Sequence, residues 1–141
     1  MTMPVFAAGE EPPASKMQTL SDGIMGTASG QGWTNVTFAS GWVAFDASLY
    51  RGVKYRKIGA IVYVQGMCKR SSTTSTAGQT IFTLPAGFRP ADRQLILFGP
   101  SGTDGTTPRR VDIGTAGTVI DAIGGMTTAH LLSLNFSFPA T

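Results

Sequence analysis

The chain has 141 residues, a hydrophobic share of 42%, a charged share of only 13% and a net charge of +3. This length predicts one domain, or one domain with a tail. The low charge excludes intrinsic disorder, and it excludes a helical bundle or coiled coil, whose outer faces need many charged residues. The 18 glycines and the many threonines favour turns and strands, and therefore an all-β fold.

Several kinds of site and partner are excluded in the same way. A net charge of +3 is too small to predict nucleic-acid binding without a concentrated basic patch. One cysteine and one histidine cannot form a disulfide or a Cys/His metal site within one chain, so we expect no metal and no cofactor. No apolar run is long enough for membrane insertion. The first residues lack the pattern of a secretion signal, so we expect synthesis and folding in the cytoplasm.

Residues 1–22 predict an extended N-terminal arm with one short helix. Pro12 and Pro13 disfavour a helix before them. Residues 14–20 can form a short helix with Met17 and Leu20 on one face. Because so short a helix is marginal alone, we expect the arm to dock on a partner. Residues 23–32, rich in glycine and small polar side chains, predict a flexible linker.

From residue 33 to residue 141, short strand patterns follow one another between turn residues. We expect about nine strands in an antiparallel, jelly-roll-like β-sandwich, with Trp33 and Trp42 in its core. The last strand is the clearest, because Leu132, Leu134, Phe136 and Phe138 alternate with polar residues. The expected strands cover residues 34–38, 42–45, 53–56, 61–64, 80–84, 94–98, 110–113, 119–121 and 132–138.

The segment Ile81-Phe82-Thr83-Leu84-Pro85-Ala86-Gly87-Phe88-Arg89-Pro90 predicts a corner of the sandwich. Pro85 ends a strand because it cannot donate to a ladder, and Gly87 permits a left-handed turn. We expect Phe88 to return to the core while Arg89 and Pro90 stay at the surface.

The order of several motifs resembles the C-terminal β-sandwich head domains of bacteriophage tail fibres, minor tail proteins and receptor-binding proteins. The segment 81–90 is the most specific of them. The others are Gly41-Trp42-Val43, residues 53–59, residues 61–66 and the closing alternation at 132–138. The segment Phe6-Ala7-Ala8-Gly9-Glu10, with residues 14–17 and Leu20 after it, resembles the virion-attachment end of fibres from phages of actinobacteria.

The resemblance implies a structural protein of a tailed phage virion, a short trimeric tail fibre or spike. The arm, through Phe6, Met17 and Leu20, would attach it to other virion proteins, and the head would contact the host cell surface. A capsid decoration protein of the same fold is the alternative. A carbohydrate-processing enzyme is less favoured, because it needs a convergent pair of carboxylates. The aspartates beyond the linker are scattered along the sequence: Asp46, Asp92, Asp104, Asp112 and Asp121.

A cluster of cations around one strand is the strongest charge feature. It comprises Arg51, Lys54, Arg56 and Lys57, and Lys54 and Arg56 share one face because side chains alternate along a strand. In one interpretation, this face does no more than discourage edge-to-edge pairing of strands. Alternatively, it attracts an anionic surface polymer such as teichoic acid or a phosphorylated glycan.

Two loops rich in hydroxyl groups are the second candidate surface. Residues 71–78 include Ser72, Thr73 and Thr74, and residues 101–107 include Asp104. They are either plain exposed turns or a sugar-binding end of the sandwich, since binding residues concentrate on loops.

Two further residues carry reactive side chains. Cys68 is expected to be a small buried hydrophobic residue. His130 is expected to make a surface or inter-chain hydrogen bond. A catalytic role, or a metal site shared by three copies on a three-fold axis, is the less favoured alternative for His130.

Overall fold

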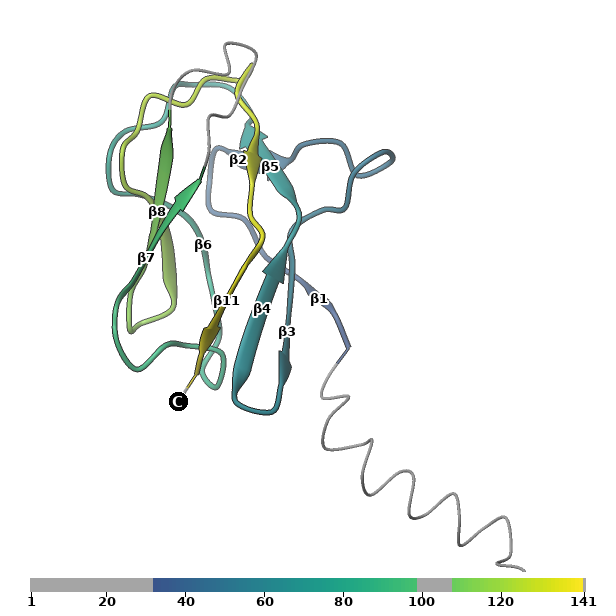
Figure 1. Cartoon of the computed structure of the whole chain (residues 1–141). Helices are drawn as coiled ribbons and strands as arrows, with labels where there is room; N and C mark the ends of the chain where they lie inside the picture. Colours follow the sequence, from purple (N-terminus) through teal and green to yellow (C-terminus); the bar gives the residue numbers. More distant parts are fainter. Residues whose placement is uncertain (1–31, 99–107, 141) are drawn as a thin grey trace, which may run out of the picture.

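The computed structural model describes residues 32–98 and 108–140, and these residues form eleven β-strands. Figure 1 shows their arrangement in the chain. The strands are β1 (Thr34–Asn35), β2 (Trp42–Ala44), β3 (Lys54–Ile58), β4 (Ile61–Gln65), β5 (Met67–Arg70), β6 (Gln79–Thr83), β7 (Gln94–Phe98), β8 (Arg109–Ile113), β9 (Thr118–Asp121), β10 (Leu132–Ser133) and β11 (Phe136–Pro139).

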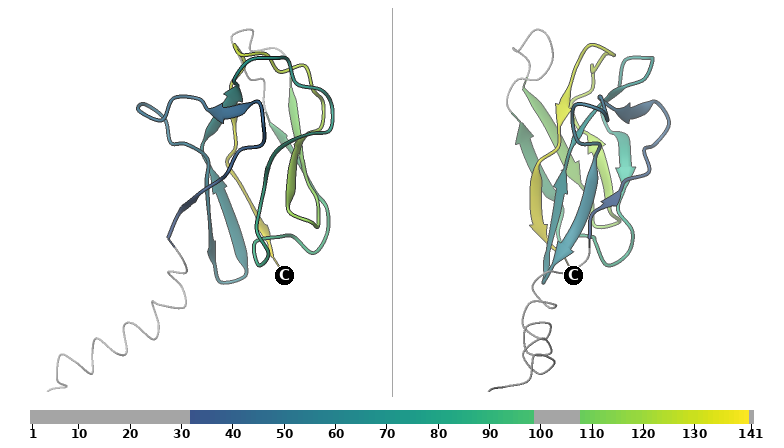
Figure 2. Two further views of the ribbon diagram at one scale, coloured as in Figure 1. Left: turned by 180° about the vertical axis from the view of Figure 1, so that it is seen from behind. Right: turned by 90° about the vertical axis from the view of Figure 1, so that its right-hand side faces the viewer.

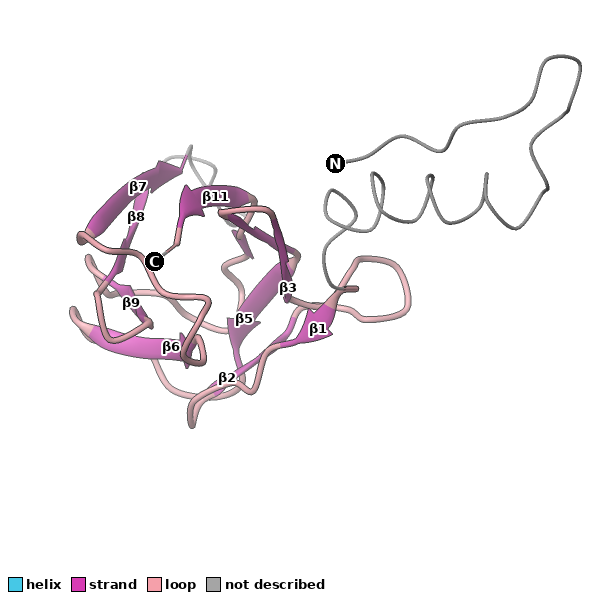
Figure 3. Cartoon of the chain, turned by 90° about the horizontal axis from the view of Figure 1, so that it is seen from below, coloured by secondary structure: helices cyan, strands magenta, loops and turns pink. Residues whose placement is uncertain are grey.

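The strands form two layers that face each other across a core (Figures 2 and 3). One layer is the sheet β6-β9-β8-β7, and the other combines the sheets β1-β3-β4-β11 and β10-β5-β2. The paired strands are antiparallel throughout. The predicted all-β antiparallel sandwich is therefore confirmed. The N-terminal arm and its expected helix lie outside the described residues.

None of the residues that the structure describes belongs to a helix long and apolar enough to cross a membrane.

The two sheets of the second layer are joined at Gly66, which separates β4 from β5. Gly66 has a φ of 130°, a conformation that side-chain-bearing residues rarely adopt. A Cβ there would lie 2.5 Å from the carbonyl oxygen of Gly52. The neighbouring segment, β10–β11, bends at the same level, where the backbone N–H of Leu134 donates to the Gly66 carbonyl at 2.8 Å. As a result, β4–β5 and β10–β11 form one long, bent ribbon.

This bend explains why the structure has more strands than the sequence predicted. The segment after Gly66, expected to be only the end of a strand, forms the separate strand β5. The expected last strand is divided into β10 and β11 around Leu134 and Asn135. Its alternation still holds, since Leu132, Leu134 and Phe138 are all buried.

The core is filled from both layers by aliphatic and aromatic side chains. Cys68 is completely buried among them, as expected, and burial raises the pKa of its thiol to about 12. The buried hydrophobic residues are Trp42, Val53, Val62, Val64, Cys68, Ile81, Phe82, Leu84, Val111, Ile113, Val119, Met126, Leu132, Leu134 and Phe138.

The corner predicted at residues 81–90 joins the layers. Phe88 packs against the core and meets the Tyr55 ring edge-on, with ring centroids 5.0 Å apart. Arg89 reaches back to donate to the Leu84 carbonyl at 3.0 Å. Pro90 was expected at the surface, and this was wrong: it is buried, because it forms a β-bridge with Ala140 that brings the two layers together.

Replacing Gly66 should test the bend. Gly66→Ala should lower the free energy of unfolding by about 2–4 kcal/mol, because the added Cβ meets backbone at a strained φ. Gly59→Ala is the matched control: Gly59 has a φ of 58° and open space around its Cβ position. Its loss should be about 1 kcal/mol. Urea unfolding measures both, and equal losses would contradict the role of Gly66.

Candidate functional site

Three of the four predicted cations lie on one outward-facing surface. In the β3–β4 register, Lys54 lies opposite Gln65 and Arg56 opposite Tyr63. Lys57 lies opposite the buried Val62 and therefore points to the other face of β3. There it donates to the Gly87 carbonyl at 3.0 Å. We call Arg51, Lys54 and Arg56 the basic face. The structure does not bring Lys57 together with them.

Trp33 connects two members of the basic face. The guanidinium carbon of Arg56 lies 4.6 Å from the centre of the Trp33 ring, and that of Arg51 lies 5.3 Å from it. These distances fit cation–π interactions, which hold both arginines near the indole. Trp33 was expected in the core, and this was wrong: it is only half-buried. Side chains two apart on a strand share a face, so Trp33 shares the outer face of Asn35. Extending the alternation of the first strand back to residue 33 would have predicted this position.

The described carboxylates do not neutralise the basic face. Both ion pairs recorded among the described residues use Asp112 on the other layer, with Arg93 at 3.2 Å and Arg110 at 2.9 Å. The buried Asp121 accepts from the Ser75 hydroxyl at 2.6 Å. Within residues 32–98 and 108–140, the three cations therefore keep their charge available for an external anion.

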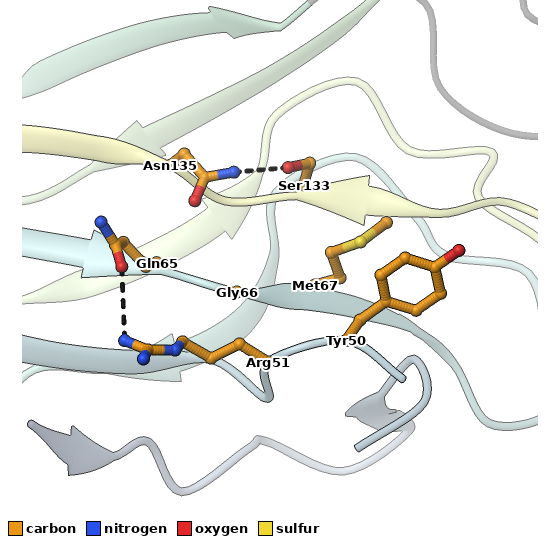
Figure 4. A pocket seen from close by; sticks show the side chains of 7 residues that line it. All are labelled: Tyr50, Arg51, Gln65, Gly66, Met67, Ser133 and Asn135. Carbon is orange, nitrogen blue, oxygen red and sulfur yellow. Dashed lines mark hydrogen bonds between the residues drawn. The ribbon is translucent and has the colours of Figure 1, made fainter. Parts of the chain in front are cut away.

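A pocket of about 250 Å³ opens beside Arg51 at the bend of the ribbon (Figure 4). Its lining combines a guanidinium, two amides, a hydroxyl, an aromatic ring and a thioether. We call it the Arg51 pocket. The lining residues are Tyr50, Arg51, Gln65, Gly66, Met67, Ser133 and Asn135.

Backbone hydrogen bonds bring the walls of the Arg51 pocket together. Met67 donates its N–H to the Arg51 carbonyl at 3.0 Å, and Leu134 donates to the Gly66 carbonyl. Arg51 donates to the Gln65 side chain on the neighbouring segment at 3.4 Å, and Asn135 donates to the Ser133 hydroxyl on its own segment at 2.6 Å. No described lining residue is a carboxylate, so this pocket lacks the carboxylate pair that a glycoside hydrolase uses.

The residues before Arg51 form a turn held by Asp46. One carboxylate oxygen of Asp46 accepts from the Ser48 N–H, the Ser48 hydroxyl and the Leu49 N–H. The Asp46 carbonyl accepts from the Tyr50 N–H at 2.8 Å. The Tyr50 ring also lies against Phe45, with centroids 5.3 Å apart. This turn was not predicted from the sequence, although an Asp side chain commonly accepts from the backbone two residues further on and so marks a turn.

The hydroxyl-rich loop at 71–78 lies at the opposite end of the sandwich from the β3–β4 turn (Figure 1). Ser72, Thr73 and Thr74 are exposed. Buried side chains hold both ends of this loop. The buried Arg70 donates to the Thr73 carbonyl at 2.7 Å and to its hydroxyl at 3.0 Å, and the Ser75 hydroxyl is buried against Asp121.

The other predicted site residues either lie outside the described residues or make hydrogen bonds to nearby residues in the sequence. Asp104, Phe6, Met17 and Leu20 belong to the first group. His130 is half-buried, and its Nδ1 accepts from the Thr127 N–H at 2.9 Å. The described ranges 32–98 and 108–140 contain no group of three or more His, Cys, Asp or Glu residues arranged to hold a metal ion.

The Asp46 turn generates a prediction about ionisation. The Ser48 hydroxyl is the largest of the causes that hold the pKa of Asp46 below its ordinary value. The turn should therefore persist at neutral pH and weaken only as the pH falls through the lowered pKa. Ser48→Ala should raise the pKa of Asp46 in an NMR titration of the carboxyl carbon. Ser137→Ala, on β11, is the control, and an unchanged Asp46 pKa in Ser48→Ala would contradict this account.

No protein-family model and no curated protein matches the chain. Solved structures similar to it in fold include two phage proteins. The receptor-binding protein (gp15) of Listeria phage PSA superposes with a TM-score of 0.57 at 16% identity, over 93% of this chain and 82% of that chain. The head domain of the lactococcal phage bIL170 gives a TM-score of 0.50 at 17% identity, over 78% of this chain and 98% of that chain. The sandwich therefore has the fold of phage receptor-binding head domains, which confirms the fold implied by its motifs.

Proposed function

We propose that the chain is a structural protein of a bacteriophage virion, a short trimeric tail fibre or spike whose head contacts the host cell surface. The shared fold with two phage receptor-binding proteins supports this role. The observation that carries it on this chain is the basic face, where Arg51, Lys54 and Arg56 lack carboxylate partners among the described residues. Such a surface attracts an anionic polymer of a cell wall, for example teichoic acid or a phosphorylated glycan.

The same proposal assigns a separate role to each segment of the chain. Residues 1–22 attach the protein to other virion proteins, residues 23–32 act as a linker, and residues 33–141 form the head. The described chain enters the sandwich at β1, away from the end that carries the loop 71–78 (Figure 1). An arm fixed to the particle would thus leave that loop end turned outward.

Trimer formation can be measured directly. Several apolar side chains stay exposed on the isolated head, including Leu95 at 57% and Ile123 at 46%, which supports burial between copies. Light scattering of the full chain should give three times its mass of 14.8 kDa. A mass that stays at one chain over a wide range of concentration would contradict the trimer.

Binding to cell walls tests the receptor role. The labelled full chain should bind isolated walls from a panel of Gram-positive bacteria, and binding should weaken steeply with added salt, because exposed charges are screened. The double variant Lys54→Ser/Arg56→Ser should lose about fivefold in affinity per removed cation, the effect of about 1 kcal/mol for a cation beside an anionic surface.

The strand supplies its own control. Lys57→Ser removes the same charge as Lys54→Ser from β3 but on the opposite face, so it should leave wall binding unchanged. Equal losses in the two single variants would contradict a role for the basic face. Wall binding that does not depend on salt concentration would favour the loop 71–78 as the binding surface and a neutral glycan as the receptor. Failure to bind any wall would favour the capsid decoration role.

A further inference from the structure

We propose that the Arg51 pocket binds one polyhydroxylated unit of the receptor that carries an anionic group, either a phosphate ester or a carboxylate. Arg51 holds the anionic group, and Gln65, Ser133 and Asn135 hold the hydroxyl groups. The inference rests on the proposed function and adds to it a defined ligand site.

The pocket is built into the fold. Its floor is Gly66, where the absence of a side chain lets the backbone pass within contact distance of Gly52 and Val53. The two walls are fixed to this floor by the backbone hydrogen bonds of Met67 and Leu134. A ligand therefore meets a preformed site and does not have to order one, which lowers the cost of binding.

The polar groups in the pocket suit a unit with several hydroxyl groups. The amides of Gln65 and Asn135 each offer a donor and an acceptor, and the hydroxyl of Ser133 offers both. Neighbouring hydroxyl groups of a sugar or polyol need the same mixture. Figure 4 shows Gln65 on one segment of chain and Ser133 and Asn135 on another.

Arg51 supplies the charge recognition. Its hydrogen bond to Gln65, at 3.4 Å, is longer than a normal N–H···O bond and uses one of five N–H donors. The remaining donors can form the paired bonds that a phosphate or carboxylate accepts. The Trp33 ring at 5.3 Å limits the positions open to the guanidinium.

Tyr50 and Met67 form the apolar part of the pocket. Tyr50 is 47% exposed, and the Asp46 turn and the Phe45 ring limit the movement of its side chain. A restrained aromatic ring provides contact area at a low entropic cost, and one of its faces can cover the C–H side of a sugar.

The remaining cations extend the site beyond one unit. Lys54 lies directly opposite Gln65, and Arg56 follows on the same face of β3. Alternate residues of a strand are about 6.7 Å apart. The ligand that uses the whole surface is therefore a polymer with repeated anionic groups, one unit in the pocket and the next along β3.

Calorimetric titration of the full chain with small probes tests the inference. Glucose 1-phosphate or glucuronate should bind at least tenfold more tightly than glucose or inorganic phosphate, because only the first two combine charge and hydroxyl groups. The tighter of the two identifies the anionic group. Trp33 fluorescence should change on binding, since Arg51 contacts its ring. The proposal is overturned if glucose binds as tightly as the two charged sugars. It is also overturned if no probe shows saturable binding up to about 10 mM, which is ten times a dissociation constant of 1 mM.

A matched pair of variants locates the site. Gln65→Glu should form an ion pair with Arg51 and reduce probe affinity at least tenfold while the fold stays intact. Gln79→Glu makes the same change on β6, where the side-chain oxygen accepts from the Thr76 N–H and a carboxylate can do so equally. It should bind probes like the original chain. Equal affinities in the two variants overturn the assignment to the Arg51 pocket.

The two proposals fail in different ways. Wall binding that is lost in Lys54→Ser/Arg56→Ser but intact in Gln65→Glu keeps the receptor role and overturns the pocket. Probe binding that depends on Gln65, in a chain that binds no wall, keeps the pocket and overturns the receptor role.

Discussion

The bend at Gly66 is the constraint on which both the layer and the Arg51 pocket depend. A φ of 130° turns β4 into β5, and the Leu134–Gly66 hydrogen bond makes the partner strand turn at the same level. Without the bend, one flat sheet would run past the core, and no recess would form on its outer side. The glycine therefore lets the ribbon cover the core on one face and open the Arg51 pocket on the other.

The sequence predicted those parts of the fold that depend on alternation. Buried Leu132, Leu134 and Phe138, and the outward pair Lys54 and Arg56, follow from the period of two along a strand. The places where a strand bends or is divided could not be predicted from alternation. A glycine between two strand patterns looks the same whether it ends a strand or bends one, and only its pairing with Leu134 decides between the two.

The candidate site was predicted in part for a related reason. Charge is visible in a sequence, so the cluster of Arg51, Lys54 and Arg56 was predicted, and Lys57, which lies on the other face of the strand, was grouped with it because its face was not considered. The Arg51 pocket was missed because its polar residues come from segments as far apart as Tyr50 and Asn135. Gln, Asn and Ser at strand ends carry no distinctive pattern until the register brings them together.

The alternation of β3 has a consequence for how such a protein can change its ligand. Tyr55 packs on Phe88 and Lys57 donates to the Gly87 carbonyl, whereas Lys54 and Arg56 lie on the other face of the strand. Under the proposed function, adjacent positions are therefore under separate selection, one set for folding and the other for recognition. In a lineage that moves between hosts, accepted substitutions should accumulate at every second residue of this strand, and the intervening residues should stay fixed.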